Sequence, residues 1–235
     1  MPAPSVSRHL PPGLAIVHED RDIIVVDKPA GMLTMATETE NIRTAYYALT
    51  DYVRKGNPKS KHRIFIVHRL DRETSGIVVF AKTEDAKRAL QEGWAETVKM
   101  YAAVVHGRMG QSSGMIISHL VESGAHKVYS TRDTALGKLS RTAWTVVRER
   151  GAYSLLDVEL LTGRKHQIRV QMADLGHPVA GDRKYGVKGD TFSRLALHAR
   201  LATFTHPFSG QRMTVEAPVP TIFAQLVGRA GGGLS

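Results

Sequence analysis

The 235-residue chain has no cysteine, which excludes disulfides, thiolate metal ligands and a cysteine nucleophile. It also has no apolar run close to the ~20 residues that a membrane-spanning helix needs. Residues 1–12 include Arg8 but no apolar core, so they do not resemble a secretion signal. We therefore expect a soluble, cytoplasmic protein with no membrane partner.

Several motifs of nucleotide and metal chemistry are missing as well. The sequence has no GxxxxGK[ST] phosphate loop, no GxGxxG after a strand, no GxSxG turn and no HExxH helix. Its 11 histidines follow no familiar metal-ligand spacing: His166 and His177 are 11 residues apart, and His198 and His206 are eight apart. The sequence thus predicts no cofactor and no metal site.

Positive charge, in contrast, is abundant. Thirty-two Lys and Arg residues against 22 Asp and Glu give a net charge of +10, and such a surplus attracts polyanions, of which nucleic acid is the commonest in cells. The surplus is uneven, because Lys138 to Arg212 holds 13 basic and six acidic residues and a second basic run covers Arg54 to Arg63. A solvated basic surface and a nucleic-acid footprint explain this charge about equally well.

The chain is typical of one domain with loose ends. Residues 1–12 are rich in proline, and residues 231–235 are rich in glycine. Between them, no Pro/Gly/Ser-rich linker and no repeat of fixed period divides the chain. We expect a flexible arm over residues 1–12, one domain of catalytic size over 13–220 and a C-terminal tail over 221–235.

Short β-rich runs dominate this domain and do not alternate strictly with helices. Strands are predicted over residues 22–27, 63–67, 76–81, 100–106, 142–147 and 153–160. Helical periodicity predicts helices over residues 44–53, 83–98 and 165–175, with Thr83 as an N-cap and with Ile168, Met172 and Leu175 on one apolar stripe. The fold class is therefore α+β, with a mixed, mainly antiparallel sheet and flanking helices.

Two charge-dense segments carry the candidate chemistry. In the first, His68 to Gly76, Asp71 lies between Arg69 and Arg72 in a short connection between two predicted strands. In the second, Leu161 to Gln171, Arg169 lies on the flank of the apolar stripe, from which it can reach a partly buried carboxylate and keep it ionised. Taken alone, each segment also fits a surface ion pair or a solvated arginine.

These segments belong to five ordered blocks, and with them the sequence closely resembles the RluA-like family of RNA pseudouridine synthases. The resemblance runs from Ile16 to Pro220, and HRLDxxTSG is its most specific motif. The blocks are EDRDIIVVDKPAGM (residues 19–32), HRLDRETSGIVVFAKT (68–83), KMYAAVVHG (99–107), LLTGRKHQIRVQMADLGHPVAGDRKYG (160–186) and LALHARLATFTHPFSG (195–210).

The resemblance implies an isomerase that converts uridine in structured RNA, ribosomal or transfer RNA, into pseudouridine without a cofactor. Asp71 matches the catalytic aspartate that attacks the target uridine. Arg69 matches the arginine that helps displace the target base, Tyr101 the tyrosine that stacks on the uracil ring, and Arg169 the arginine that pairs with the catalytic aspartate. The fold it implies is the pseudouridine synthase fold, a bent sheet with a central RNA-binding cleft.

Two departures from the family pattern matter. Gln171, in VQM, stands where the family more often has the histidine of VHL, so that histidine cannot be essential here. The short N-terminal stretch also leaves no room for the small RNA-binding domain of many relatives, so we expect target recognition by the catalytic domain itself.

Two alternatives and several details stay open. A non-catalytic RNA-binding or ribosome-assembly protein could share the scaffold, although Asp71, Tyr101 and Arg169 are all present. A carboxylate-dependent nuclease is disfavoured, because Asp71 and Glu73 have basic neighbours and no third acid to hold a metal. The sequence does not give the target uridine, the atom that Asp71 attacks or the final base, and a monomer is the default expectation.

Overall fold

The computed structural model of the protein describes residues 10–38, 40–55, 57, 59–124 and 127–228. They form two compact units. Unit 1 comprises the chain up to Thr97 together with Leu201–Ala217, and unit 2 comprises Val98–Arg200 together with the chain from Pro218 onward. Among the described residues, no helix is both long and apolar enough to cross a membrane.

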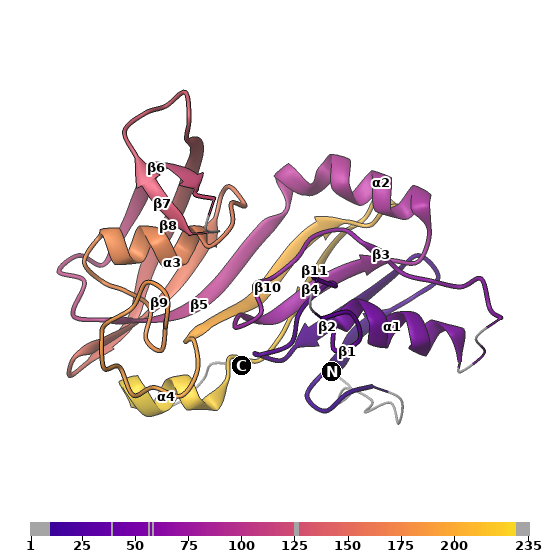
Figure 1. Ribbon diagram of the computed structural model, residues 1–235, viewed down its shortest axis with the longest axis horizontal. Helices are drawn as coiled ribbons and strands as arrows, with labels where there is room; N and C mark the ends of the chain where they lie inside the picture. Colours follow the sequence, from indigo (N-terminus) through magenta and orange to yellow (C-terminus); the bar gives the residue numbers. More distant parts are fainter. Residues whose placement is uncertain (1–9, 39, 56, 58, 125–126, 229–235) are drawn as a thin grey trace. The chain divides into compact units, whose positions relative to one another are not determined.

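Unit 1 is an antiparallel sheet with two helices (Figure 1). Strand β2 pairs with β1 and with β4, β3 pairs with β4, and β11 pairs with the second half of β10. The elements are β1 (Ala15–Glu19), β2 (Ile23–Lys28), α1 (Ala45–Arg54), β3 (Phe65–Ile66), β4 (Ser75–Ala81), α2 (Glu84–Glu92) with a 3₁₀ turn at Gly93–Glu96, the second half of β10 (Leu197–Thr205), and β11 (Arg212–Glu216).

The core of unit 1 explains why its central strands are continuous apolar runs. All seven residues of β4 and five of the six residues of β2 are buried, as expected for strands that are covered on both faces. Helix α2 closes one face with Ala86 and Leu90, which join Phe204 and Val215 in one cluster of buried side chains. Burial of each large side chain stabilises the unit by about 1.5–3 kcal/mol.

Both helices of unit 1 begin at a threonine that caps them. Thr44 Oγ1 accepts the backbone N–H of Tyr47, and Thr83 Oγ1 accepts that of Ala86. Each cap satisfies one of the four N–H groups that a helix leaves unpaired at its start. The predicted N-cap at Thr83 is confirmed.

Unit 2 is an antiparallel sheet in the order β5-β9-β8-β6-β7, with helices α3 and α4 (Figure 1). The seven residue pairs between β5 and β9 align Met100 with Glu159 and His106 with Tyr153. The elements are β5 (Val98–His106), β6 (Ser113–Glu122), β7 (Val128–Thr131), β8 (Lys138–Arg150), β9 (Tyr153–Leu160), α3 (Gln167–Asp174), the first half of β10, and α4 (Thr221–Val227).

The predicted α+β class with a mainly antiparallel sheet is confirmed, and the six predicted strands and three predicted helices are present. Strands β1, β6, β7, β10 and β11 were not predicted. The expected apolar stripe of α3 is wrong at its end, because the helix stops at Asp174 and Leu175 is 43% exposed. Most of the expected arm, residues 1–9, lies outside the described residues, and the expected tail begins with α4, whose Phe223 and Val227 are buried. The division of the chain into arm, domain and tail stays a prediction.

Candidate active site

Asp71 lies in unit 1, in the loop that joins β3 to β4. The loop is anchored at its start by His68, whose Nε2 accepts the backbone N–H of Val79 at 3.0 Å and whose ring stacks on Trp94 with 4.3 Å between centroids. Arg69 is exposed and Asp71 is half-buried. The Asp71 carbonyl accepts the backbone N–H of Thr74, which forms a turn directly before β4.

The backbone on both sides of Asp71 is held by the segment Lys28–Thr34, which we refer to as the brace. Thr34 is buried, and its hydroxyl makes two bonds to Leu70: Oγ1 donates to the Leu70 carbonyl at 3.0 Å and accepts the Leu70 N–H at 3.1 Å. A single side chain therefore satisfies both backbone groups of the residue before Asp71. Buried backbone groups left without such partners are costly.

The residue after Asp71 is held in the same way. The Arg72 carbonyl accepts the backbone N–H of Gly31 at 2.7 Å and Lys28 Nζ at 3.4 Å, and Arg72 Nε donates back to the Gly31 carbonyl at 3.0 Å. Lys28 is fully buried, and its ammonium also donates to the carbonyls of Pro29 and Met32. The brace thus holds the backbone of Leu70 and of Arg72, the two residues on either side of Asp71.

Tyr101 lies in unit 2, in β5, where it is 9% exposed and pairs across the sheet with Val158. Side chains alternate along a strand, so Lys99 lies on the same face of β5 as Tyr101. Burial lowers the pKa of Lys99 below its ordinary value, and the nearby charge of Glu159 opposes that change. A tyrosine ring and a half-buried lysine therefore share one face of this strand.

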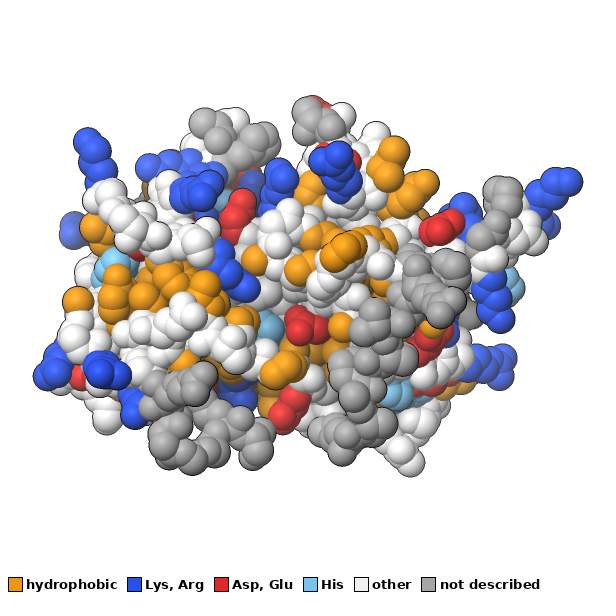
Figure 2. Space-filling model, turned by 90° about the horizontal axis from the view of Figure 1, so that it is seen from below, with side chains coloured by type: hydrophobic (Ala, Val, Ile, Leu, Met, Phe, Trp, Pro, Cys, Tyr) orange, Lys and Arg blue, Asp and Glu red, His pale blue; other side chains and the backbone are white. Residues whose placement is uncertain are grey.

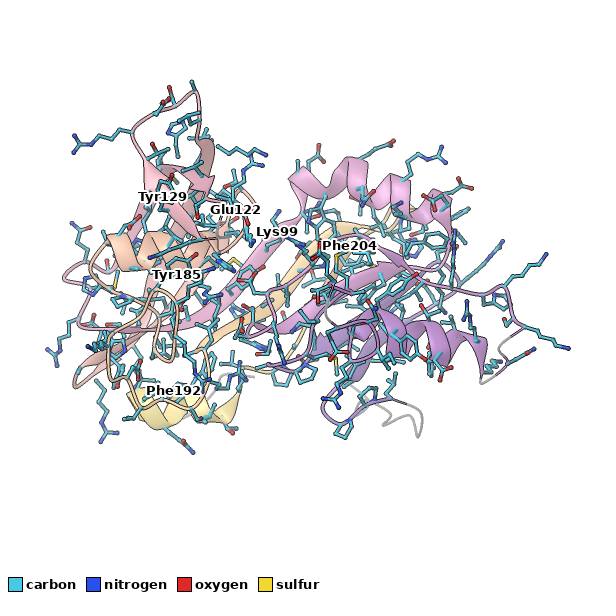
Figure 3. The ribbon with its side chains drawn as sticks, viewed as in Figure 1. Lys99, Glu122, Tyr129, Tyr185, Phe192 and Phe204 are labelled. Atoms are coloured by element: carbon cyan, nitrogen blue, oxygen red, sulfur yellow. The ribbon has the colours of Figure 1, made fainter. Side chains whose placement is uncertain are left out.

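Arg169 lies in α3 of unit 2 and binds a buried carboxylate. Its Nε donates to Asp182 Oδ2 at 2.7 Å and its Nη2 to Asp182 Oδ1 at 2.8 Å, while the guanidinium lies 5.3 Å from the centre of the Tyr185 ring. Figure 3 labels Tyr185. Burial raises the pKa of Asp182, but the hydrogen bond and charge of Arg169 outweigh it, so that the pKa is lowered. Arg169 thus reaches inward to the carboxylate of Asp182. Its predicted pairing with the catalytic aspartate, Asp71, stays a prediction.

Gln171, which departs from the family pattern, joins α3 to the sheet. Its Oε1 accepts Thr142 Oγ1 at 2.6 Å, and its Nε2 donates to Ser118 Oγ and to the Ser140 carbonyl. The side chain is fully buried, and the amide satisfies three polar groups at once. Position 171 therefore serves packing of the helix on β6 and β8.

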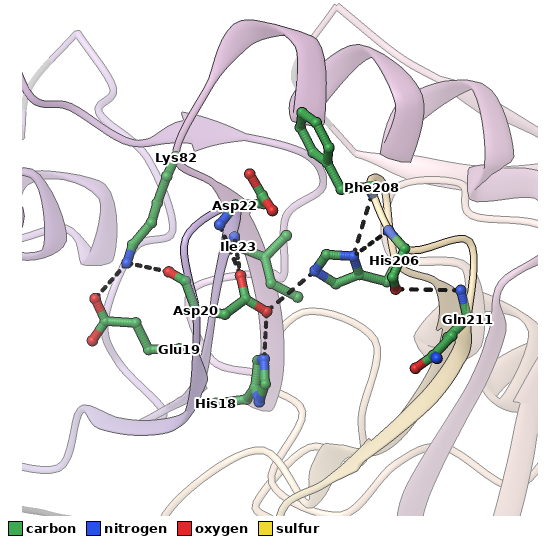
Figure 4. Close-up of polar contacts among 10 residues, drawn as sticks. His18, Glu19, Asp20, Asp22, Ile23, Lys82, His206, Phe208 and Gln211 are labelled. Carbon is green, nitrogen blue, oxygen red and sulfur yellow. Dashed lines mark hydrogen bonds and ion pairs between the residues drawn. The ribbon is translucent and has the colours of Figure 1, made fainter.

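One cluster in unit 1 has the composition of a metal site: Asp20, Asp22 and His206. The hydrogen bonds in Figure 4 show how its atoms are used. His206 Nδ1 accepts the backbone N–H groups of Phe208 and Ser209, so the neutral ring carries its proton on Nε2, which lies 3.2 Å from Asp20 Oδ2. A ring that is protonated at Nε2 offers no lone pair to a metal ion at that atom. We therefore interpret the cluster as a set of hydrogen bonds that joins the β1–β2 turn to the β10–β11 turn.

Cations are prominent on the surface of both units. In unit 2 the exposed cations include Lys138, Arg141, Arg164 and Lys188. At the left of Figure 2, in the part of the picture that unit 2 occupies, Lys and Arg side chains surround a hydrophobic patch. In unit 1 the basic run after α1 is exposed at Lys55, Lys59, Lys61 and Arg63. Both predicted basic regions thus place charge at the surface, where phosphates can reach it.

The comparison with known proteins identifies the family. Residues 22–174 match the family described as RNA pseudouridylate synthase. This chain belongs to the RNA pseudouridine synthase family. Its members are isomerases that convert uridine in RNA into pseudouridine, so the predicted enzyme class and activity are confirmed.

Individual relatives agree over nearly the whole chain. An uncharacterized RNA pseudouridine synthase of Mycoplasma genitalium is 34% identical over 217 residues, which cover 90% of this chain and 68% of the relative. Ribosomal large subunit pseudouridine synthase D of Nitrosomonas europaea is 37% identical over 230 residues, or 91% of this chain and 64% of the relative. Among solved structures, human RNA pseudouridylate synthase domain containing 1 is 27% identical with a TM-score of 0.71, covering 91% of this chain and 86% of that one.

The four predicted site residues are divided equally between the units, with Arg69 and Asp71 on one loop of unit 1 and Tyr101 and Arg169 in unit 2. Sequence reasoning missed Thr34, Lys28 and Asp182. For Asp182 a signal was available, because a buried arginine needs a carboxylate and block 160–186 offers few. No local signal marks Thr34, which lies 36 residues from its partner Leu70.

Proposed function

We propose that this protein isomerises a uridine in a structured stem-loop of ribosomal or transfer RNA, with Asp71 as the nucleophile. The names of relatives that act on the large ribosomal subunit support ribosomal RNA in particular. The observation that carries the proposal is the brace, which holds Leu70 and Arg72 and so positions the carboxylate between them. We further propose that the protein acts in the cytoplasm as a monomer.

The reaction needs no outside reactant. The N1–C1′ bond of uridine breaks, the uracil turns, a C5–C1′ bond forms, the proton leaves C5, and N1 gains one. Asp71 would add either to C6 of the ring or to C1′ of the sugar and be released at the end. A general base must remove the C5 proton, and Tyr101 is the candidate that the family resemblance supplies.

Binding must also extract the base from its stack. Unstacking costs a few kcal/mol, and stacking on an aromatic ring such as that of Tyr101 returns about 1–3 kcal/mol per base. We propose that Arg69 helps displace the base, and that Arg169 pairs with Asp71. Exposed cations of the two basic regions would hold phosphates, so affinity should fall steeply with salt, and affinity independent of salt would contradict this role.

The test is tritium release from RNA labelled at C5 of uridine, with total RNA from a strain that lacks the protein as substrate. Wild type should release tritium, and Asp71→Asn should lower the rate by at least about a thousandfold, since Asn keeps the shape but supplies no carboxylate. Asp85→Asn is the matched control, because Asp85 is an exposed carboxylate of α2. It should behave as wild type.

The outcomes separate the alternatives. Release that survives EDTA excludes a metal-dependent nuclease, which would lose its metal ions. Tight binding of the same RNA without any release by wild type would instead favour the non-catalytic RNA-binding protein. Equal rates for wild type and Asp71→Asn would refute the role of the carboxylate.

A further inference from the structure

Unit 1 contains a cavity that directly adjoins the brace. Its volume is about 750 Å³, within the range of ligand-binding pockets. Its walls come from residues 10–12, from residues 29–33 of the brace, from the segment 40–51 that leads into and through α1, and from Arg72. Asp71 is not among the lining residues, but Arg72, which follows it directly in the chain, is, and Arg72 is tied to Gly31 by reciprocal hydrogen bonds.

The apolar side chains of the cavity are unusually accessible. Tyr47 is 49% exposed and Ile42 is 64% exposed, although both are large and apolar. The Tyr47 ring is thus available to a ligand, and a flat aromatic surface in a hollow suits stacking of a nucleobase.

The charged groups of the cavity have both signs. Arg43 and Arg72 provide guanidinium groups, which bind phosphate well. Glu40 and Asp51 provide carboxylates. The backbone N–H of Arg43 lowers the pKa of Glu40, while burial opposes the change and the charges of Arg43 and Arg72 add to it, so Glu40 is ionised at neutral pH. Carboxylates accept hydrogen bonds from exocyclic amino groups, which adenine, cytosine and guanine carry and uracil lacks.

We propose that this cavity binds one unpaired nucleotide of the substrate RNA next to the target uridine. Its base stacks on Tyr47 and presents an amino group to the carboxylates, and its phosphate lies between Arg43 and Arg72. The proposal rests on the proposed function, since it places the target uridine at Asp71. Arg72 links the two positions: it occupies the first variable position of the HRLDxxTSG motif, whereas Tyr47 lies outside that motif.

The test compares matched variants in the tritium-release assay. Tyr47→Ala and Arg43→Gln should each raise KM about tenfold with kcat within about twofold of wild type, because they remove binding and leave the brace intact. Tyr129→Ala is the control for the ring, since Tyr129 is 48% exposed in unit 2, and Arg88→Gln is the control for the guanidinium. Both controls should keep the wild-type KM.

A second measurement does not depend on catalysis. Hexaadenylate with a fluorescent label contains no uridine, so its affinity, measured by anisotropy, does not depend on isomerisation, and the difference between a cavity variant and its matched control reports on the cavity. Tyr47→Ala should weaken it about tenfold and Tyr47→Phe should not, since phenylalanine keeps the stacking surface. Hexauridylate should bind the wild-type cavity less tightly, because uracil offers no amino group.

The two proposals fail differently. If wild type releases tritium, KM decides: Tyr47→Ala and Arg43→Gln with wild-type KM values would overturn the nucleotide site and leave the isomerase intact. If wild type releases no tritium, the hexaadenylate affinity decides. A loss of hexaadenylate affinity in the cavity variants alone would then support the nucleotide site in a protein of another function. Equal hexaadenylate affinities for Tyr47→Ala and Tyr129→Ala would overturn the nucleotide site.

Discussion

Replacing Thr34 by valine tests whether the brace positions Asp71. Valine has nearly the same shape, but it removes both hydrogen bonds to Leu70. The Leu70 N–H and carbonyl would then lie buried without these partners, at a cost of about 1–3 kcal/mol for each unsatisfied group. Allowing for partial relaxation, we expect a loss of about 2–3 kcal/mol in the free energy of unfolding.

The structure supplies a matched control within unit 1. Thr50 in α1 is 8% exposed, and among the described residues its hydroxyl is the one buried side-chain polar atom without a hydrogen-bond partner. Thr50→Val makes the same chemical change but breaks no hydrogen bond. It should leave stability within about 0.5 kcal/mol of wild type or raise it slightly.

Urea denaturation with unchanged m-value measures the stability difference, and tritium release measures the effect on catalysis. Thr34→Val should lower kcat by about 10- to 100-fold, because small misplacements of a catalytic group cost this much, whereas KM should hardly change. Thr34→Ser, which keeps the hydroxyl, should restore most of kcat. Equal stability and equal kcat for Thr34→Val and Thr50→Val would refute the reasoning.

Three further changes follow from other contacts. Asp182→Asn removes the carboxylate charge that Arg169 binds in the interior of unit 2 and should lower the unfolding free energy by about 3–5 kcal/mol in urea, where a loss below 1 kcal/mol would contradict a buried pair. Burial raises the pKa of Asp20, but hydrogen bonds from His18 and from backbone N–H groups outweigh it and lower the pKa from 3.8 to about 2. Asp20→Asn should therefore lower the free energy of unfolding by about 1 kcal/mol above pH 4 and by progressively less as the pH falls to 2, as measured by denaturation across that range. Gln171→His should destabilise by about 1 kcal/mol in thermal melts, because imidazole cannot serve all three partners of the amide.

The elements that could be predicted from sequence are those whose pattern is local. Strand β9 occupies the predicted residues 153–160, because Leu156, Val158 and Leu160 alternate with polar residues and turns bound the strand. Strand β6 was missed because it alternates exposed and half-buried residues and contains Gly114, Ser118 and His119, which do not favour strands. Helix α2 was predicted too long, since at Gly93 the chain changes to a 3₁₀ turn.

The candidate site shows the same division. The residue types at Asp71, Tyr101 and Arg169 could be identified because the blocks that contain them are contiguous in the sequence. Lys28 could not, because it ends an apolar strand and looks like an exposed charge, whereas its ammonium is buried against three backbone carbonyls. Such roles depend on which carbonyls the fold brings to the side chain, and no periodicity reports this.

The brace and the cavity use the same residues for different purposes, which makes them separable by kinetics. The backbone of Arg72 is held by Gly31 and Lys28, while its side chain lines the cavity. A change that frees the loop, as at Thr34, disturbs the reacting carboxylate in the transition state and so acts on kcat. A change in the cavity, as at Tyr47, removes contacts made equally before and during the reaction and so acts on KM. A change at Thr34 that acts on kcat and a change at Tyr47 that acts on KM would together show that the contacts that position Asp71 are separate from the contacts that bind the nucleotide.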